Sequence, residues 1–294
     1  MIAKTGEQLL EICEKENISL SEYAIRYEIE EKGLTREEVI ERMRKNLHVM
    51  MNAANEGREK EVYSVSGLIG GDGYKINKYA KNRKTLTGRA TNIAMAMALS
   101  SSEVNASMGK IVACPTAGSC GILPAVILAA GEQLELSEDE LIQGLLAAGA
   151  VGMIIGMNAT LSGAEGGCQA ECGSASAMGA AAVVEMMGGT PKMSLDAGSI
   201  ILQNVLGLVC DPVAGLVEIP CAKRNAQGAI TALCTADMVM AGVDAKIPFD
   251  DAVSAMYKVG KSLPAELRET ALGGVAITKA GLALKEKVFG KDEE

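Results

Sequence analysis

The chain has 294 residues, a formal net charge of −9 and no tryptophan. Hydrophobic residues make up 48% and charged residues 22% of it, a balance that excludes an intrinsically disordered protein. The acidic charge excludes nucleic acid as an expected partner, because phosphates are repelled by a negative surface. With 33 Gly, 16 Met and only two Phe, the interior must be filled by small side chains and methionine. We therefore expect closely packed helices.

The first sixty residues predict helices with one polar face. Ser19 precedes a helical stretch that Gly33 can end in the left-handed conformation. Thr35 and Glu38 form a capping box, in which each side chain bonds a free backbone amide of the other residue. Apolar residues then recur at helical spacing at Val39, Ile40, Met43, Leu47 and Met50. We expect an N-terminal helical arm over residues 1–60.

A glycine-rich stretch follows at Ser64–Gly73. That many glycines cannot sustain a helix, so the stretch is predicted to be a loop. Free backbone amides in such a loop can bind an anion, but the spacing matches neither a Walker motif nor a dinucleotide-binding fingerprint. Ligand contact and an ordinary surface loop both remain open here.

From Arg89 onward the pattern is mainly helical. Ser137 and Glu140 form a second capping box, and Pro248–Asp251 precedes a further helix. No alternating β-branched run and no helix–strand alternation suggests a sheet. The predicted fold class is all-α, with one compact bundle of helices in a single domain over residues 1–294.

One uncharged stretch, Gly144–Ser162, is nearly long enough to cross a membrane. Four glycines interrupt it and Glu165 follows it, so a buried core helix is favoured and no membrane is expected as a partner. The N-terminus has no hydrophobic region typical of a signal peptide. We therefore expect a cytoplasmic protein.

The eight cysteines do not indicate disulfides in a cytoplasmic chain, because the cytosol keeps thiols reduced. Cys13 and Cys234 lie in helical surroundings and are expected in the core. Cys114 and Cys120 flank a turn that leads into a helix. Free amides at such a turn can bind a carboxylate.

Three other cysteines lie beside residues that break regular structure. Cys168 follows two glycines, Cys210 precedes Asp211-Pro212, and Cys221 follows a proline. Thiolates at loop positions can converge on a soft metal, and iron–sulfur clusters prefer such ligands. The spacing matches neither a ferredoxin nor a zinc ribbon. From the residues alone, metal binding and buried thiols both remain open.

Histidine usage limits the possible chemistry. The only histidine is His48, on an amphipathic helix, where a structural role is expected. A histidine-dependent hydrolase formed by this chain alone is therefore disfavoured. A single imidazole also excludes zinc catalysis that rests on several histidine ligands.

Four separated motifs, in the same order, resemble those of one family. They lie at residues 114–125, 167–171, 210–225 and 267–274. Over nearly its whole length the chain resembles the α chain of the iron–sulfur-dependent L-serine dehydratases, also called L-serine ammonia-lyases.

The resemblance implies an all-helical catalytic domain with a [4Fe–4S] cluster as cofactor. Carried over motif by motif, the ligands are Cys168, Cys210 and Cys221, and Cys172 is a neighbour rather than a ligand. The implied reaction converts L-serine to pyruvate and ammonia, with an open iron as Lewis acid on the substrate hydroxyl. No motif typical of the pyridoxal-phosphate enzymes, which catalyse the same reaction, forms a coherent set here.

The same motifs suggest residues that contact the substrate. Those expected to bind L-serine are Thr116, Gly118, Ser119, Arg224 and Asn225. Lys223 is a further candidate, as a carboxylate ligand or as a charge that neutralises the cluster. Arg268 and Glu269 contact the substrate or form a surface helix pair, and both readings remain open. The family motifs do not identify the catalytic residue that removes the α-proton.

The chain departs from its single-chain relatives in two ways. Those relatives end with a cysteine that can occupy the open iron, whereas Leu282–Glu294 contains none. They also carry an additional N-terminal domain, which two-chain members supply as a separate β subunit. We expect a hetero-oligomer in which this β subunit contributes part of the pocket, including the base.

Three alternatives stand beside this hypothesis. The first is a cysteine desulfidase on the same scaffold, and the second is a non-catalytic protein that carries a cluster as a scaffold or sensor. The third is a structural zinc protein. Turnover of serine against cysteine and metal analysis would separate them.

Overall fold

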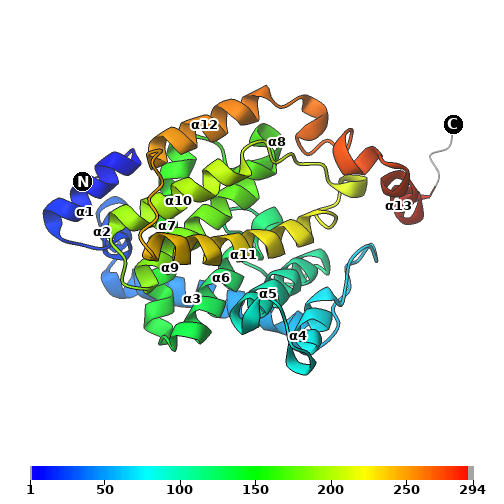
Figure 1. The fold of residues 1–294 in the computed structure, drawn as a ribbon, viewed down its shortest axis with the longest axis horizontal. Helices are drawn as coiled ribbons and strands as arrows, with labels where there is room; N and C mark the ends of the chain where they lie inside the picture. The colour runs from blue at the N-terminus through cyan, green and yellow to red at the C-terminus, as the bar shows by residue number, and fades with distance from the viewer. Residues whose placement is uncertain (1, 291–294) are drawn as a thin grey trace.

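The computed structural model describes residues 2–290 of the chain (Figure 1). Met1 and residues 291–294 of the predicted domain lie outside the described residues. Within this part of the chain the fold is all-α, which confirms the predicted fold class. Residues 2–290 form thirteen α-helices, joined by short 3-10 and π-helical turns, and they contain two isolated β-bridges but no strand.

Helix α1 lies at one end of the long axis of the molecule and α13 lies at the other (Figure 1). Their bounds are α1 Gly6–Glu16, α2 Leu20–Lys32, α3 Arg36–Glu59, α4 Asp72–Asn82, α5 Gly88–Ala106, α6 Ile122–Leu134, α7 Glu138–Asn158, α8 Gly163–Gly166, α9 Ser174–Met186, α10 Pro191–Val205, α11 Cys221–Met240, α12 Phe249–Ser262 and α13 Lys279–Phe289.

The first three helices form as their end signals predict. The Ser19 side chain accepts from Glu22 N at the start of α2, and Gly33 ends that helix at φ 65°. Thr35 and Glu38 form both bonds of the capping box at the start of α3. Within the fold, α2 packs on α7 and α3 packs on α5.

The centre of the molecule is α9, which packs against α6, α7, α10 and α11. Small residues allow these close contacts, as the composition predicts. A Cβ added to Gly144 would lie 2.6 Å from Met186 Sδ, and one added to Gly152 would lie 2.7 Å from Met178 Cε. Glycine and methionine therefore pack where a larger pair would not fit.

In the described part of the chain, two helical stretches are long and apolar enough to cross a membrane, at residues 117–134 and 138–158. The fold covers 72% of the first and 67% of the second. The expectation that residues 144–162 belong to a buried core helix is confirmed, although α7 ends at Asn158.

The prediction for Cys13 is confirmed, because its side chain is buried, but the prediction for Cys234 is wrong. Cys234 is exposed on α11. The buried positions of that helix include Ala229, Ala232 and Ala236, which follow each other at helical spacing. Cys234 lies two residues from Ala232 and two from Ala236, and therefore on the opposite face.

The arrangement of the helices brings three of their N-termini together. The 3-10 turn η1, Ala117–Ser119, leads into α6, and the π-helical turn η2, Gln169–Gly173, leads into α9. These two turns contact each other and the start of α11. Because helix N-termini carry unpaired N–H groups and partial positive charge, their meeting point favours anions.

Candidate functional site

The three cysteines predicted as metal ligands meet at this point. Cys168 immediately precedes η2, Cys210 follows α10, and Cys221 is the first residue of α11. The sulfurs are close enough that the charge of Cys168 acts on both Cys210 and Cys221. Cys168 and Cys210 are buried and Cys221 is half-buried. We call these three residues the cysteine site.

The environments of the three thiols differ. A hydrogen bond from the Cys172 thiol and the positive charge of Arg224 lower the pKa of Cys168, against the effect of burial. Burial, with the charge of Cys168, raises the pKa of Cys221 to about 12 and that of Cys210 further above its usual range. Burial alone therefore opposes three thiolates here, whereas a soft metal that replaces the thiol protons would stabilise them.

Arg224 is the cation of the cysteine site. Its Nη1 donates to Val209 O at 2.8 Å and forms an ion pair with Asp211 Oδ1 at 2.9 Å. Asp211 Oδ2 in turn accepts from Val275 N at 2.7 Å. These contacts hold the guanidinium group of Arg224 beside Cys168. The resemblance implies another role for Arg224, as a substrate ligand.

The segment at residues 267–269 holds the loop of Cys210. Cys210 N donates to Leu267 O at 2.9 Å, and Glu269 N donates to Cys210 O at 2.7 Å. Arg268 therefore forms an isolated β-bridge with Cys210, and Glu269 follows it with a left-handed φ of 63°. The reading of these two residues as a surface helix pair is wrong, because neither lies in a helix: Arg268 ends the 3-10 turn Ala265–Leu267 and pairs with Cys210, and Glu269 N donates to Cys210 O.

Asn225 and Ser119 stabilise the loop at residues 114–121. Asn225 Nδ2 donates to Gly118 O at 2.7 Å and to Cys221 O at 2.9 Å, and its Oδ1 accepts from Gly121 N at 2.9 Å. The Ser119 side chain is fully buried and bonds to Thr116. Both residues were predicted to bind substrate, and both make contacts within the protein that shape the loop.

A pocket of about 530 Å³ opens next to the cysteine site. It includes Thr116 and Gly118, two of the predicted substrate ligands. We call it the Thr116 pocket, and it is lined by Thr116, Ala117, Gly118, Thr160, Leu161, Ser162, Glu171, Val217 and Glu269.

Glu171 is a site residue that the sequence reasoning missed. It lies in η2 between Cys168 and Cys172, and only 9% of its surface is exposed. Burial raises the pKa of its carboxyl, while hydrogen bonds from Thr116 and from the Gly163 backbone oppose this shift. A carboxylate inside a run of glycine and cysteine was the signal available in the sequence.

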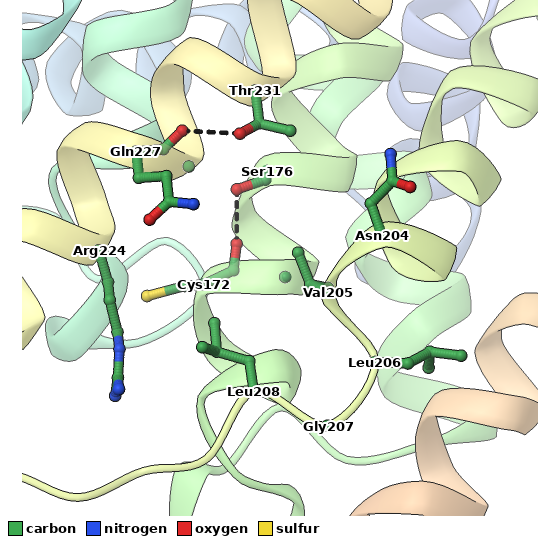
Figure 2. Close-up of a pocket in the computed structure, with 12 residues that line it drawn as sticks. Cys172, Ser176, Asn204, Val205, Leu206, Gly207, Leu208, Arg224, Gln227 and Thr231 are labelled. Carbon is green, nitrogen blue, oxygen red and sulfur yellow. Dashed lines mark hydrogen bonds between the residues drawn. The ribbon is translucent and has the colours of Figure 1, made fainter.

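A second pocket, of about 270 Å³, lies on the α10 and α11 side of η2. Figure 2 shows the Cys172 sulfur directed toward the Arg224 side chain, and the Ser176 hydroxyl bonded to the Cys172 carbonyl. Asn204 and Gln227 line the same pocket. Cys172 therefore lies beside Cys168 and also faces this second pocket.

Other candidates lie outside both pockets. Lys223 forms a surface ion pair with Asp72 at 3.0 Å, and His48 lies on α3 with its Nε2 3.2 Å from Glu138 Oε2. The predicted loop Ser64–Gly73 is present up to Gly71, and α4 begins at Asp72. Ser66 in that loop donates to Glu218.

No three His, Cys, Asp or Glu side chains within residues 2–290 enclose a site for a single metal ion. A four-iron cluster is larger than one ion, so its thiolate ligands stand farther apart. The donor set of the cysteine site is made of soft thiols with an adjacent Arg224 charge, which fits a cluster in chemistry.

The sequence profile described as "Serine dehydratase alpha chain" matches residues 15–276. The chain belongs to this family. It is 48% identical over 284 residues to the "Probable L-serine dehydratase, alpha chain" of Bacillus subtilis (strain 168), covering 97% of this chain and 94% of that protein. It is 45% identical over 281 residues to the "L-serine dehydratase, alpha chain" of Peptoniphilus asaccharolyticus, covering 96% of each.

A third relative in the comparison is longer than this chain. The "L-serine dehydratase" of Streptomyces coelicolor is 36% identical over 283 residues, which cover 93% of this chain but only 60% of that protein. Members of the family with the same aligned region therefore differ in what else they carry.

Proposed function

We propose that the chain is the catalytic subunit of an iron–sulfur-dependent L-serine ammonia-lyase, which converts L-serine to pyruvate and ammonia in amino-acid catabolism. The observation that carries this proposal is the meeting of Cys168, Cys210 and Cys221 beside the Thr116 pocket. Membership of the serine dehydratase alpha chain family supports the substrate and the reaction.

In the proposal Cys168, Cys210 and Cys221 hold a [4Fe–4S] cluster, which supplies a Lewis acid for the substrate hydroxyl when it is bound. Arg224 offsets part of the negative charge of the thiolates, because it lies next to Cys168. The N-termini of α6, α9 and α11 add partial positive charge at the same point. The Thr116 pocket holds the substrate.

Thr116 and Gly118 are the residues of the 114–121 loop that we propose contact L-serine, because they line the pocket. Asn225 and Ser119 act through the shape of this loop, since their polar groups are bonded within it. Arg224 orients the site through Val209 and Asp211.

We also propose that a separate β subunit completes the enzyme, in the cytoplasm. The chain's only histidine, His48, lies on α3 against Glu138 and lines neither of the two pockets beside η2. The longer Streptomyces coelicolor relative carries further sequence outside the region aligned with this chain. In this view residues 1–294 form one catalytic domain, and the β subunit supplies the base.

Anaerobic reconstitution with iron and sulfide, followed by assays with L-serine and L-cysteine, tests the proposal. We expect pyruvate and ammonia from L-serine, with higher turnover when the β subunit is present. Sulfide release from L-cysteine as the main activity would favour the desulfidase alternative. A stable cluster without either activity, even with the β subunit, would favour a scaffold or sensor.

A further inference from the structure

Glu171 is held in place on one wall of the Thr116 pocket. The Thr116 hydroxyl and the Gly163 N–H both donate to its carboxylate. A Cβ added to Gly163 would lie 2.6 Å from Glu171 Oε2, and one added to Gly118 would lie 3.3 Å from each carboxylate oxygen. Glycine at these two positions leaves the space that the carboxylate occupies.

Glu269 lines the same pocket. Its backbone has φ 63°, and its N–H is bonded to Cys210 O. The two carboxylates are close enough for the charge of Glu269 to act on Glu171. The pocket therefore presents two carboxylates on separate segments, and both segments are fixed by backbone hydrogen bonds.

Within residues 2–290 no lysine or arginine forms an ion pair with either carboxylate, and the nearby Arg224 is paired with Asp211. The thiolates of the cysteine site would add negative charge to the same region. Negative charges gathered in one pocket repel each other, and a bound cation relieves this repulsion. A cationic ligand that enters the pocket can supply this charge.

An amino acid substrate carries one cation, its α-ammonium group. We propose that the carboxylates of Glu171 and Glu269 bind this ammonium group and so select amino acids over hydroxy acids. This inference rests on the proposed function, because it concerns the substrate of the same pocket. The hydroxyl groups of Thr160 and Ser162 lie in the same pocket and add hydrogen-bonding capacity beside the two carboxylates.

The test uses L-alanine and propanoate, which differ only in the ammonium group and contain no leaving hydroxyl. Their dissociation constants are measured by calorimetry on the reconstituted enzyme with its β subunit. We expect the wild type to bind L-alanine more tightly than propanoate. In Glu171→Gln this preference should fall at least about tenfold, as expected for the loss of a hydrogen bond to a charged group.

Glu269→Gln, on an exposed residue, should lower the same preference without a risk to folding. Glu165→Gln removes one negative charge from nearby α8, outside the pocket, and should leave the preference unchanged.

If Glu171→Gln and Glu269→Gln both keep the wild-type preference, the inference is wrong. It is also wrong if the affinities for both ligands fall equally. Pyruvate formation by the wild type is measured separately, so a failure of the proposed function is recognised independently.

Discussion

The backbone N–H of Glu269 donates a 2.7 Å hydrogen bond to the carbonyl oxygen of Cys210. This bond joins two motifs that lie far apart in the sequence. It places one carboxylate of the Thr116 pocket on the segment that positions a proposed cluster ligand. The substrate pocket and the cysteine site are therefore built from the same backbone contacts.

Gly274 lies directly against Asp211, the residue that follows Cys210. It has φ 59°, and a Cβ there would lie 2.1 Å from Asp211 Oδ2. We expect Gly274→Ala to lower the free energy of unfolding by about 2–4 kcal/mol, from backbone strain plus the displaced Asp211. Urea denaturation measures this change.

Gly33→Ala is the matched control for the strain alone. Gly33 has φ 65°, and a Cβ there would meet nothing within 4 Å. Gly33→Ala should lower the free energy of unfolding by about 1 kcal/mol. Equal losses in the two variants would mean that the contact with Asp211 contributes nothing.

Asn225→Ala should destabilise the 114–121 loop. The substitution leaves Gly118 O and Gly121 N without their buried partner. We expect a loss of about 2–4 kcal/mol in the free energy of unfolding, together with a rise in KM for L-serine. Thermal and urea denaturation measure the first effect and pyruvate formation the second.

Asn204→Ala is the comparison for this variant, because Asn204 is an exposed amide on α10. It should change stability by less than about 0.5 kcal/mol. A wild-type stability in Asn225→Ala would contradict the role assigned to the amide.

Glu103 predicts a pH dependence of stability. It is buried, its Oε1 accepts from Asp72 N at 2.6 Å at the start of α4, and burial raises its pKa from 4.5 to about 7. An acid with a raised folded-state pKa contributes stability that is fully present below about pH 4.5 and is lost as the pH rises through about 7. Asp72 adds to the shift and Lys75 opposes it.

Glu103→Gln removes this titration and keeps an acceptor for Asp72 N. We expect the variant to exceed the wild type in stability at pH 8 by on the order of 1–3 kcal/mol, and the difference to shrink toward pH 5. Urea denaturation at both pH values measures it. Glu31→Gln, at an exposed position of α2, should show no such dependence. A constant difference between Glu103→Gln and wild type would disprove the assignment.

The helix ends were predictable because their signals are local. Ser19, Thr35 and Ser137 each bond amides within their own first turn, so a short stretch of sequence contains the whole cause. The family motifs likewise indicated Cys168, Cys210 and Cys221, and the structure brings these three together.

The remaining features depend on contacts between distant segments. The non-helical backbone at Arg268 and Glu269 is held by bonds to Cys210, and Glu171 becomes a pocket residue through Thr116 and Gly163. The face of α11 that is buried depends on its neighbours in the bundle, which is why Cys234 was misplaced. No local pattern carries this information.

The most direct test of the central account is the iron and sulfide content of anaerobically reconstituted cysteine variants, together with their visible absorption. Cys168→Ser, Cys210→Ser and Cys221→Ser should each lose the iron–sulfur chromophore and pyruvate formation. Cys172→Ser and Cys234→Ser, which keep the three proposed ligands, should retain the chromophore. Loss of the cluster in Cys172→Ser but not in Cys168→Ser would contradict the assigned ligands. Full retention in all three ligand variants would contradict the cluster itself.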